Sequence, residues 1–275
     1  MSASSLPADR DAPIRFAAAV LLSAVFLAPL GMALLTSLKS PAEIVQILSL
    51  PHRPDWGNYA VAWNQIGRSF INSIAITLPG ALLSVLVGAI GAFPLSQLRG
   101  RTGMIIYFFL LTGMLVPYQI VQVPLFDLMR HLGLYNTIPG MWLVHTAYGV
   151  PICTFFLRNF FASVPKSIFE AAMLDGCGPA GYFFRILLPA SKSGLAALAI
   201  IQSRSIWNDL LFAMTLTSTD RARPVTVQLN ALTSGLEVQY GPLMASTLIS
   251  IVPVVVAYLV FQKAFVRGML GGSSK

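Results

Sequence analysis

Six long apolar segments dominate this sequence, and they restrict the possible fold more than any other feature. Each is close to the roughly 20 residues that an α-helix needs to cross the hydrocarbon core of a bilayer. A segment in lipid must bond its own backbone polar groups, so we expect each one to be a helix. The predicted fold class is therefore all-α, a polytopic membrane helix bundle of about six transmembrane helices. The segments are 14–38, 70–95, 104–125, 139–161, 194–216 and 242–266.

Composition supports this reading and excludes a soluble enzyme. Of the 275 residues, 56% are hydrophobic and 10% are charged, whereas about 25% of residues are charged in a typical soluble domain. The net charge is +8, but the basic residues lie between the apolar segments. That placement favours orientation of the chain in a membrane, with lipid as a partner and no nucleic acid. Two cysteines and three scattered histidines predict neither a disulfide framework nor a metal site.

The distribution of Lys and Arg predicts how the chain is oriented. If the N-terminus lies inside, more basic residues fall in inside connections than in outside ones, as the positive-inside rule requires. We therefore predict a cytoplasmic N-terminal tail at 1–13, a six-helix transmembrane domain at 14–266 and a cytoplasmic C-terminal tail at 267–275. The first apolar segment is too long for a signal peptide and is expected to be an uncleaved helix.

The longest inside connection, 162–192, predicts a short helix over 166–175. Ser163 can cap the N-terminus of this helix, and Pro165 suits its first turn. Gly176 suits the position just past the C-terminus, where a left-handed backbone conformation commonly ends a helix. The connection is therefore expected to carry structure of its own outside the bilayer.

A second short helix is expected over about 180–188, and Pro189 should end it because proline cannot donate a backbone hydrogen bond. Apolar side chains on the two short helices suggest a contact surface for another protein. These side chains are Ile168, Phe169, Met173, Phe183 and Ile186.

Small and acidic residues on the first short helix also suit docking. Ala171 and Ala172 permit close approach, while Glu170 and Asp175 can accept hydrogen bonds from a basic partner. An amphipathic helix lying on the membrane surface explains the same pattern. The chemistry of the residues leaves both interpretations open.

The pattern Glu-Ala-Ala, then Asp-Gly, then Ile-Leu-Leu-Pro over residues 170–189 resembles the EAA loop of bacterial ABC importer permeases. In that family the loop forms coupling helices that sit in a cleft of the ATPase subunit. Cys177 departs from the family pattern, in which a small alanine is more usual. The resemblance implies an ATPase-coupling role for Glu170, Ala171, Ala172, Asp175, Gly176 and Pro189.

The resemblance covers most of the chain and is strongest to the carbohydrate-uptake, maltose-type subfamily. It implies a permease subunit that translocates a sugar or related polyol compound delivered by an extracytoplasmic solute-binding protein. It also implies a bacterial plasma (inner) membrane location, an ATP-binding-cassette ATPase dimer as partner, and a second permease subunit in a heterodimer. The matching segments are 37–44, 70–73, 117–126, 133–137, 207–209 and 265–272.

No phosphate-binding loop of the Gly-x-x-x-x-Gly-Lys-Ser/Thr type occurs in the sequence. We therefore expect a non-catalytic subunit with no cofactor of its own, and ATP bound by the partner ATPase. The alternative function is a secondary transporter driven by an ion gradient. Such a transporter is expected to show an internal repeat and an ion site near the membrane midplane, and the sequence indicates neither.

Polar residues gather in the fifth apolar segment. An ionised group at the bilayer centre costs about 2.5 to 3.5 kcal/mol, so these side chains should face the protein interior or a water-filled cavity. Arg204 and Asn208 share a helix face, whereas Asp209 lies about 140° around from Arg204 at roughly 100° per residue. Arg204 therefore needs a partner on another helix or subunit, and it departs from the family pattern, which is apolar here.

Two interpretations of these polar residues remain, a solute path and hydrogen bonds that hold helices together. Asn72 and Gln122 are open to the same two interpretations. The predicted translocation path consists of Arg204, Trp207, Asn208, Asp209 and Gln119.

Overall fold

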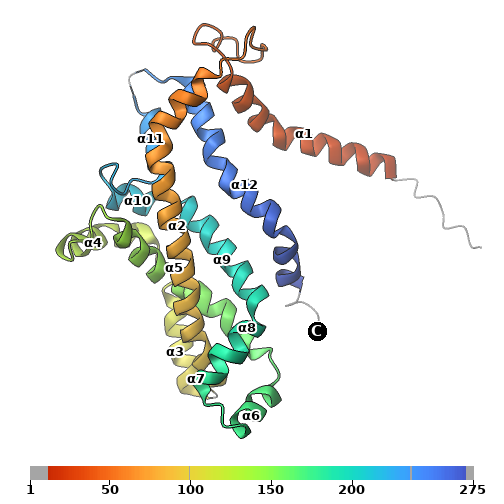
Figure 1. Ribbon diagram of the computed structural model, residues 1–275, viewed down its shortest axis with the longest axis vertical. Helices are drawn as coiled ribbons and strands as arrows, with labels where there is room; N and C mark the ends of the chain where they lie inside the picture. The colour runs from red at the N-terminus through yellow and green to blue at the C-terminus, as the bar shows by residue number, and fades with distance from the viewer. Residues whose placement is uncertain (1–11, 99, 236, 271–275) are drawn as a thin grey trace, which may run out of the picture. The chain divides into compact units, whose positions relative to one another are not determined.

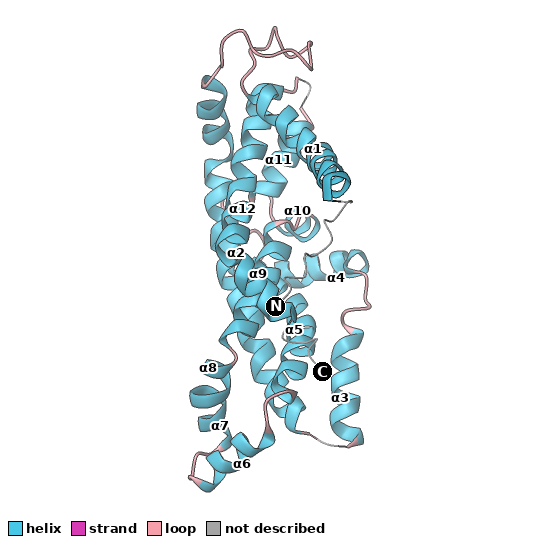
Figure 2. Cartoon of the chain, turned by 90° about the vertical axis from the view of Figure 1, so that its right-hand side faces the viewer, coloured by secondary structure: helices cyan, strands magenta, loops and turns pink. Residues whose placement is uncertain are grey.

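The computed structural model describes residues 12–98, 100–235 and 237–270, and its side chains are described for 14–98, 100–235 and 237–261. The tails predicted at 1–13 and 267–275 lie outside the residues with described side chains. Within the described chain every regular element is a helix and none is a strand, which confirms the predicted all-α class (Figures 1 and 2). The elements are α1 (Ala12–Ser37), α2 (Gly57–Gln97), α3 (Arg101–Thr112), α4 (Tyr118–His131), α5 (Ile138–Ala162), α6 (Lys166–Leu174), α7 (Pro179–Tyr182), η1 (Phe183–Leu187), α8 (Leu188–Ala190), α9 (Lys192–Trp207), α10 (Leu211–Leu216), α11 (Val225–Thr233) and α12 (Tyr240–Leu270).

Four described helices, α1, α2, α5 and α12, are each long and apolar enough to cross a membrane. A fifth candidate span is bent by 76° between Pro179–Ala190 and Lys192–Trp207, and α3 is a shorter apolar helix. The six predicted segments therefore correspond to four continuous helices and two interrupted ones. The prediction of continuous helices over 104–125 and 194–216 was wrong.

The interruption of the third segment has a local cause. Helix α3 stops at Thr112, and α4 starts only after Pro117, which has an extended backbone with φ −60° and ψ 123°. Proline disfavours the helical conformation of the residue before it and has no N–H to donate. The segment between Gly113 and Pro117 therefore turns, and the apolar run is divided between two helices.

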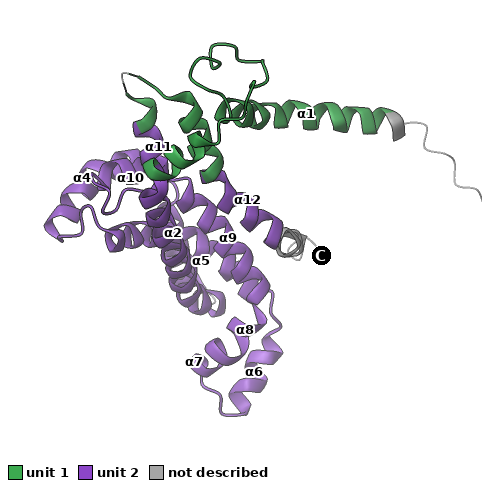
Figure 3. Cartoon of the chain, turned by 45° about the horizontal axis from the view of Figure 1, so that its top comes forward, with its two compact units in different colours: residues 1–65, 232–249 green, residues 66–231, 250–275 purple. Residues whose placement is uncertain are grey.

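By its internal contacts the chain divides into two compact units (Figure 3). One unit contains the residues up to Gln65 together with Leu232–Ile249, and the other contains Ile66–Ala231 with the residues from Ser250 onward. The second unit includes most of α2, all of α3 to α10, most of α11 and the part of α12 from Ser250 onward, and it holds both hydrophobic core clusters.

The second unit has one core cluster at each end of its helices. The first cluster joins α2, α5 and α9 to the short helices of the 162–192 loop through buried side chains such as Leu157, Phe161 and Leu187. The second cluster joins α2, α4, α5, α9 and α10 through Ile76 and Met141, among others. The 162–192 loop is thus part of the helix packing of this unit.

Close helix contact between α2 and α5 depends on glycine. An added Cβ at Gly88 would collide with the Cβ of Cys153, and it would lie 3.2 Å from the Cys153 carbonyl carbon and 3.2 Å from the Thr154 nitrogen. Small residues allow such contact between membrane helices, whose packing depends largely on van der Waals contact. At Gly91, one turn later, the nearest atom would be Thr154 Oγ1 at 3.7 Å, an ordinary contact distance.

We expect Gly88→Ala to destabilise the protein by about 1–3 kcal/mol, because the new methyl group forces α2 and α5 apart. Gly91→Ala is the matched control, with the same substitution in the same helix and open space for the methyl group. The measurement is the thermal unfolding midpoint of each purified variant in one detergent. Equal midpoints for the two variants would show that the α2–α5 contact is looser than described.

Candidate functional site

The first short helix of the 162–192 loop ends as its sequence predicts. Helix α6 covers Lys166–Leu174, and Gly176 follows it with a φ of +76°. The Gly176 N–H bonds the Met173 carbonyl at 3.1 Å, and the Cys177 N–H bonds the Ala172 carbonyl at 2.9 Å. These two bonds form a Schellman motif, in which glycine adopts the left-handed conformation at least cost. Gly176 thereby sets the direction in which the chain leaves α6.

The start of α6 differs from the prediction. The residue preceding the helix is Pro165, and no side chain caps the N-terminus. The Ser163 hydroxyl instead donates to the Phe160 carbonyl at 2.7 Å, at the end of α5. The Ser163 hydroxyl therefore bonds to the end of the preceding helix, because Val164 and Pro165 separate Ser163 from the first N–H groups of α6.

The second short helix also differs, because it does not end at Pro189. The helix continues through α8 to Ala190 before the bend at Ser191. Just before the proline, the Leu188 N–H bonds the Phe183 carbonyl five residues back, which makes the wide turn of η1. This wide turn accommodates a residue that has no N–H, so Pro189 lies inside the helix.

The apolar side chains predicted as a docking surface face mostly inward. Ala172 and Phe183 are buried, and Phe169, Met173 and Ile186 pack around the first core cluster. Aromatic contacts tie them to α2, since Phe93 stacks on Phe183 with ring centroids 5.2 Å apart. The prediction of Phe169, Met173, Phe183 and Ile186 as partner contacts was therefore wrong, because they anchor the loop to the transmembrane helices. Ile168, the fifth side chain of the predicted set, is 43% exposed, and its partner contact stays a prediction.

A different set of side chains forms the exposed face of α6 and its end. Glu170, Ala171, Asp175 and Gly176 are exposed, as the docking interpretation requires. Leu174 is 89% exposed, and our sequence reasoning did not single it out. Its spacing of three and four residues from Ala171 and Glu170 was the available signal, because residues so spaced share a helix face.

In the fifth segment, Trp207 is a packing residue. It is buried, and its Nε1 donates to the Ser250 carbonyl of α12 at 3.2 Å. Its ring meets Phe70 of α2 edge-on with centroids 5.6 Å apart. Trp207 therefore fixes α9 against α2 and α12, and the structure supports the helix-packing interpretation at this position.

Asn208 and Asp209 form the break between α9 and α10. The Asn208 side-chain amide donates to the Arg204 carbonyl at 2.9 Å, which satisfies a carbonyl at the end of α9. The Asp209 carboxylate accepts from the Ala213 N–H at 3.0 Å and from the Phe212 N–H at 3.4 Å, so it caps α10. Such local bonds compete with a continuous helix, which explains why the predicted segment is interrupted here.

Asp209 also has partners from other elements. His145 Nε2 of α5 lies 3.8 Å from Asp209 Oδ2, and both side chains are largely buried. The Thr226 hydroxyl of α11 donates to the Asp209 carbonyl at 2.6 Å. As its angular position predicted, Asp209 does not pair with Arg204, and it connects the helix break to α5 and α11.

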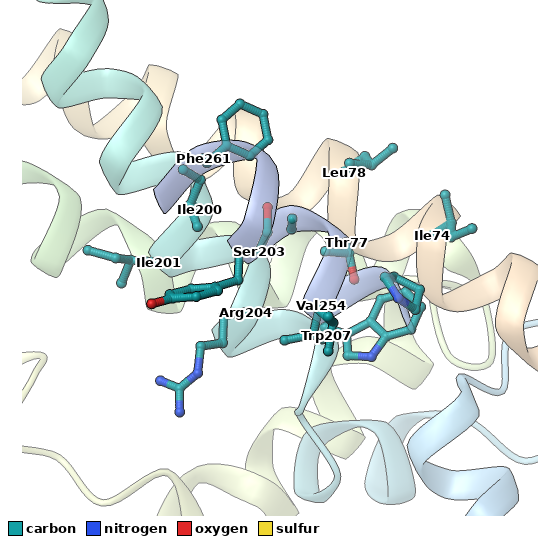
Figure 4. A pocket seen from close by; sticks show the side chains of 14 residues that line it. Ile74, Thr77, Leu78, Ile200, Ile201, Ser203, Arg204, Trp207, Val254 and Phe261 are labelled. Carbon is teal, nitrogen blue, oxygen red and sulfur yellow. The ribbon is translucent and has the colours of Figure 1, made fainter. Parts of the chain in front are cut away.

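Arg204 lies at a groove of about 770 Å³ between α2, α9 and α12 (Figure 4). The lining is mostly apolar, with Ile74, Leu78 and Ile200 among its residues. Figure 4 shows the guanidinium group extending away from the labelled apolar side chains. Among the described residues, none forms a hydrogen bond or ion pair with this group, so the partner expected for Arg204 is not found within the described chain.

The remaining polar candidates lie elsewhere. Gln119 is exposed on α4. Asn72 is buried and donates to the Asp220 and Arg223 carbonyls at 2.9 and 3.0 Å, so it ties α2 to the turn before α11. The Nε2 atom of Gln122 is buried without a hydrogen-bond partner in the described structure. Among the described residues, no group of three or more His, Cys, Asp or Glu side chains is arranged to hold a metal ion.

Comparisons with known protein families and with individual proteins all indicate the same family. Residues 80–271 match the family described as "binding-protein-dependent transport system inner membrane component". A diacetylchitobiose uptake system permease protein of Streptomyces coelicolor is 34% identical over 270 residues, covering 96% of this chain and 89% of that protein. A xylose/arabinose import permease protein of Haloferax volcanii is 32% identical over 284 residues, covering 93% of this chain and 91% of that protein.

A solved structure agrees with the sequence relatives. A crystal structure of a bacterial ABC transporter involved in the import of the acidic polysaccharide alginate contains a chain that is 25% identical, with a TM-score of 0.81. The match covers 95% of this chain and 100% of that chain. The family resemblance predicted from the sequence is therefore confirmed, and the secondary-transporter alternative is discarded. The chain belongs to the family of inner membrane components of binding-protein-dependent transport systems.

Proposed function

We propose that this permease subunit of an ABC importer translocates a sugar or related polyol compound. The observation that supports this substrate class is that relatives matching nearly the whole chain are named for the uptake of sugars or sugar derivatives. Their names specify diacetylchitobiose, xylose/arabinose and, for a protein of Agrobacterium fabrum 30% identical over 267 residues, sulfoquinovosyl glycerol. In this proposal an extracytoplasmic binding protein delivers the solute, and a second permease subunit completes the pathway.

The 162–192 loop is the proposed contact with the ATPase dimer. Its exposed face, Glu170, Ala171, Leu174 and Asp175, meets the ATPase, while its buried face holds the first core cluster. A displacement of α6 therefore moves buried side chains that pack directly on α2, α5 and α9. A packed interface of this kind transmits movement between two arrangements of the helices. We place this loop and both chain termini in the cytoplasm, in agreement with the Lys and Arg distribution.

The translocation path that we now propose contains fewer residues than the path predicted from the sequence. Trp207 and Asp209 act as positioning residues, because Trp207 bonds to α12, and the Asp209 carboxylate bonds to α10 and lies 3.8 Å from His145 of α5. Arg204, Asn208 and Gln119 have exposed side chains and are the residues proposed to face the path or the second permease subunit. For Arg204 we propose the second subunit, since a guanidinium group that has no partner among the described residues is best stabilised by a carboxylate or carbonyl across that interface.

Cysteine cross-linking tests the proposed function and the loop contact together. In a Cys153→Ala, Cys177→Ala background, we expect Leu174→Cys to cross-link to the ATPase subunit of the assembled transporter. Gln119→Cys, which is also exposed but lies on α4, is the matched control and should give no such product. Cross-linked species are identified by mass spectrometry. If no ATPase peptide is joined to position 174, the assignment of this face is incorrect.

Gly176→Val is expected to reduce binding-protein-stimulated ATP hydrolysis and transport. The left-handed conformation costs a residue with a Cβ roughly 1–2 kcal/mol, and the space around Gly176 is open, so only backbone strain is introduced. Gly176→Asn should retain more activity, because asparagine tolerates this conformation. Gly178→Val is a control in equally open space at φ −58°. Equal activities for Gly176→Val and Gly178→Val would mean that the turn does not matter for coupling.

Arg204→Met is expected to weaken association with the second permease subunit for every solute tested. Loss of one partner of a buried charged pair typically costs about 2–5 kcal/mol, and Arg204→Lys should be milder because it keeps the charge. The measurement is the amount of second permease that co-purifies with a tagged variant. Normal assembly with loss of transport of an anionic solute alone would instead make Arg204 a solute contact. Normal assembly with unchanged transport would mean that Arg204 reaches toward an interface with water.

A further inference from the structure

The connection between α1 and α2, residues 38–56, is built around a buried lysine. Lys39 is only 1% exposed, and its Nζ donates to the Gln46 and Ile47 carbonyls at 2.6 and 2.9 Å. The Asn58 amide donates to the Ser37 and Lys39 carbonyls at 3.0 Å each. A buried ammonium group must be hydrogen-bonded to offset its lost hydration. These bonds therefore fold the middle of the connection back over its start.

Glu43 makes a second set of bonds within the same connection. Its carboxylate accepts from the Ser40 N–H at 3.1 Å, the Ser40 hydroxyl at 2.9 Å and the His52 N–H at 2.9 Å. The N–H of His52 contributes most, followed by the donors of Ser40, to a pKa of Glu43 below its ordinary value. The carboxylate therefore stays ionised at neutral pH and keeps residues 40–52 closed into one compact turn.

The result is a connection whose apolar side chains point outward. Charged Lys39 is inside, and large apolar side chains between 61% and 85% exposed cover the outside. A loop in water usually shows the reverse arrangement, and an exposed apolar patch marks a surface that contacts another molecule or a membrane. The exposed apolar side chains are Val45, Ile47, Leu48, Leu50 and Trp56.

We propose that this patch, residues Val45, Ile47, Leu48, Leu50 and Trp56, inserts into the bilayer interface and anchors the α1–α2 connection on lipid. The connection follows directly on a candidate membrane span, because α1 ends at Ser37 and the most apolar 18-residue window of Ile14–Ser37 has no residue buried within the chain. Trp56 lies against Tyr59 with ring centroids 5.9 Å apart. Paired amphipathic aromatic rings are typical of the headgroup level of a membrane.

Lipid is favoured over a soluble protein as the occupant. A binding protein that delivers solute must leave in each transport cycle, and every departure would return five large apolar side chains to water. The bilayer is always present, and burial of apolar side chains in its interface is favourable at all stages. A bound solute-binding protein is therefore the alternative that the experiment must exclude.

The test uses the assembled transporter in lipid nanodiscs, with Cys153→Ala and Cys177→Ala as the background. An environment-sensitive fluorophore is attached at Leu48→Cys or, as matched control, at Arg53→Cys, which is exposed in the same connection. Lipids brominated in the upper part of the acyl chain serve as quenchers. We expect at least about twofold stronger quenching at position 48 than at position 53, because only position 48 enters the interface. Val45→Cys provides a second site with the same expectation.

Quenching at positions 45 and 48 that does not exceed quenching at position 53 would overturn the proposal. Shielding of these sites by added solute-binding protein, with no effect of brominated lipid, would overturn it in favour of a protein contact. The measurement requires neither solute nor ATP, so its outcome is independent of the substrate class and of the ATPase contact proposed above.

Discussion

A backbone polar group that faces hydrocarbon has no water to bond, so each interruption of a membrane helix must supply its own partners. The break between α9 and α10 shows how this protein meets that requirement. Asn208 satisfies a carbonyl at the end of α9, and Asp209 satisfies two N–H groups at the start of α10. His145 and Thr226 then join the break to α5 and α11. Residues that first suggest a solute path thus allow the helix to be interrupted within the bundle.

The 162–192 loop meets a different requirement, because it has to be both accessible and firmly attached. Burial of Ala172, Phe183 and their neighbours attaches it to three transmembrane helices. Exposure of Glu170, Leu174 and Asp175 leaves one face available to a partner. The Schellman motif at Gly176 separates the exposed face from the attachment to the transmembrane helices, since it ends α6 before the chain turns back toward those helices.

The α1–α2 connection reverses the usual arrangement of charged and apolar residues. Backbone carbonyls take the place of water around Lys39, and the backbone N–H of His52 with the donors of Ser40 holds Glu43. The apolar side chains are thereby free to point outward. The interpretation of this surface depends on the solvent, because apolar exposure that destabilises a protein in water stabilises one that rests in a lipid interface.

The sequence by itself determined the helical class, the position of α6, its stop at Gly176 and the family, because apolar length, helix propensity and local motifs act within a few residues. Tertiary structure decided which faces are buried. Helical spacing places Leu174 on the same face as Ala171, but only the fold shows that this shared face is exposed and that Phe183 packs inward. Likewise it groups Arg204 with Asn208, and only packing against α12 and α2 distinguishes exposed Arg204 from buried Trp207. The physical reason is that burial depends on neighbours distant in the chain, and these are brought together only by the fold.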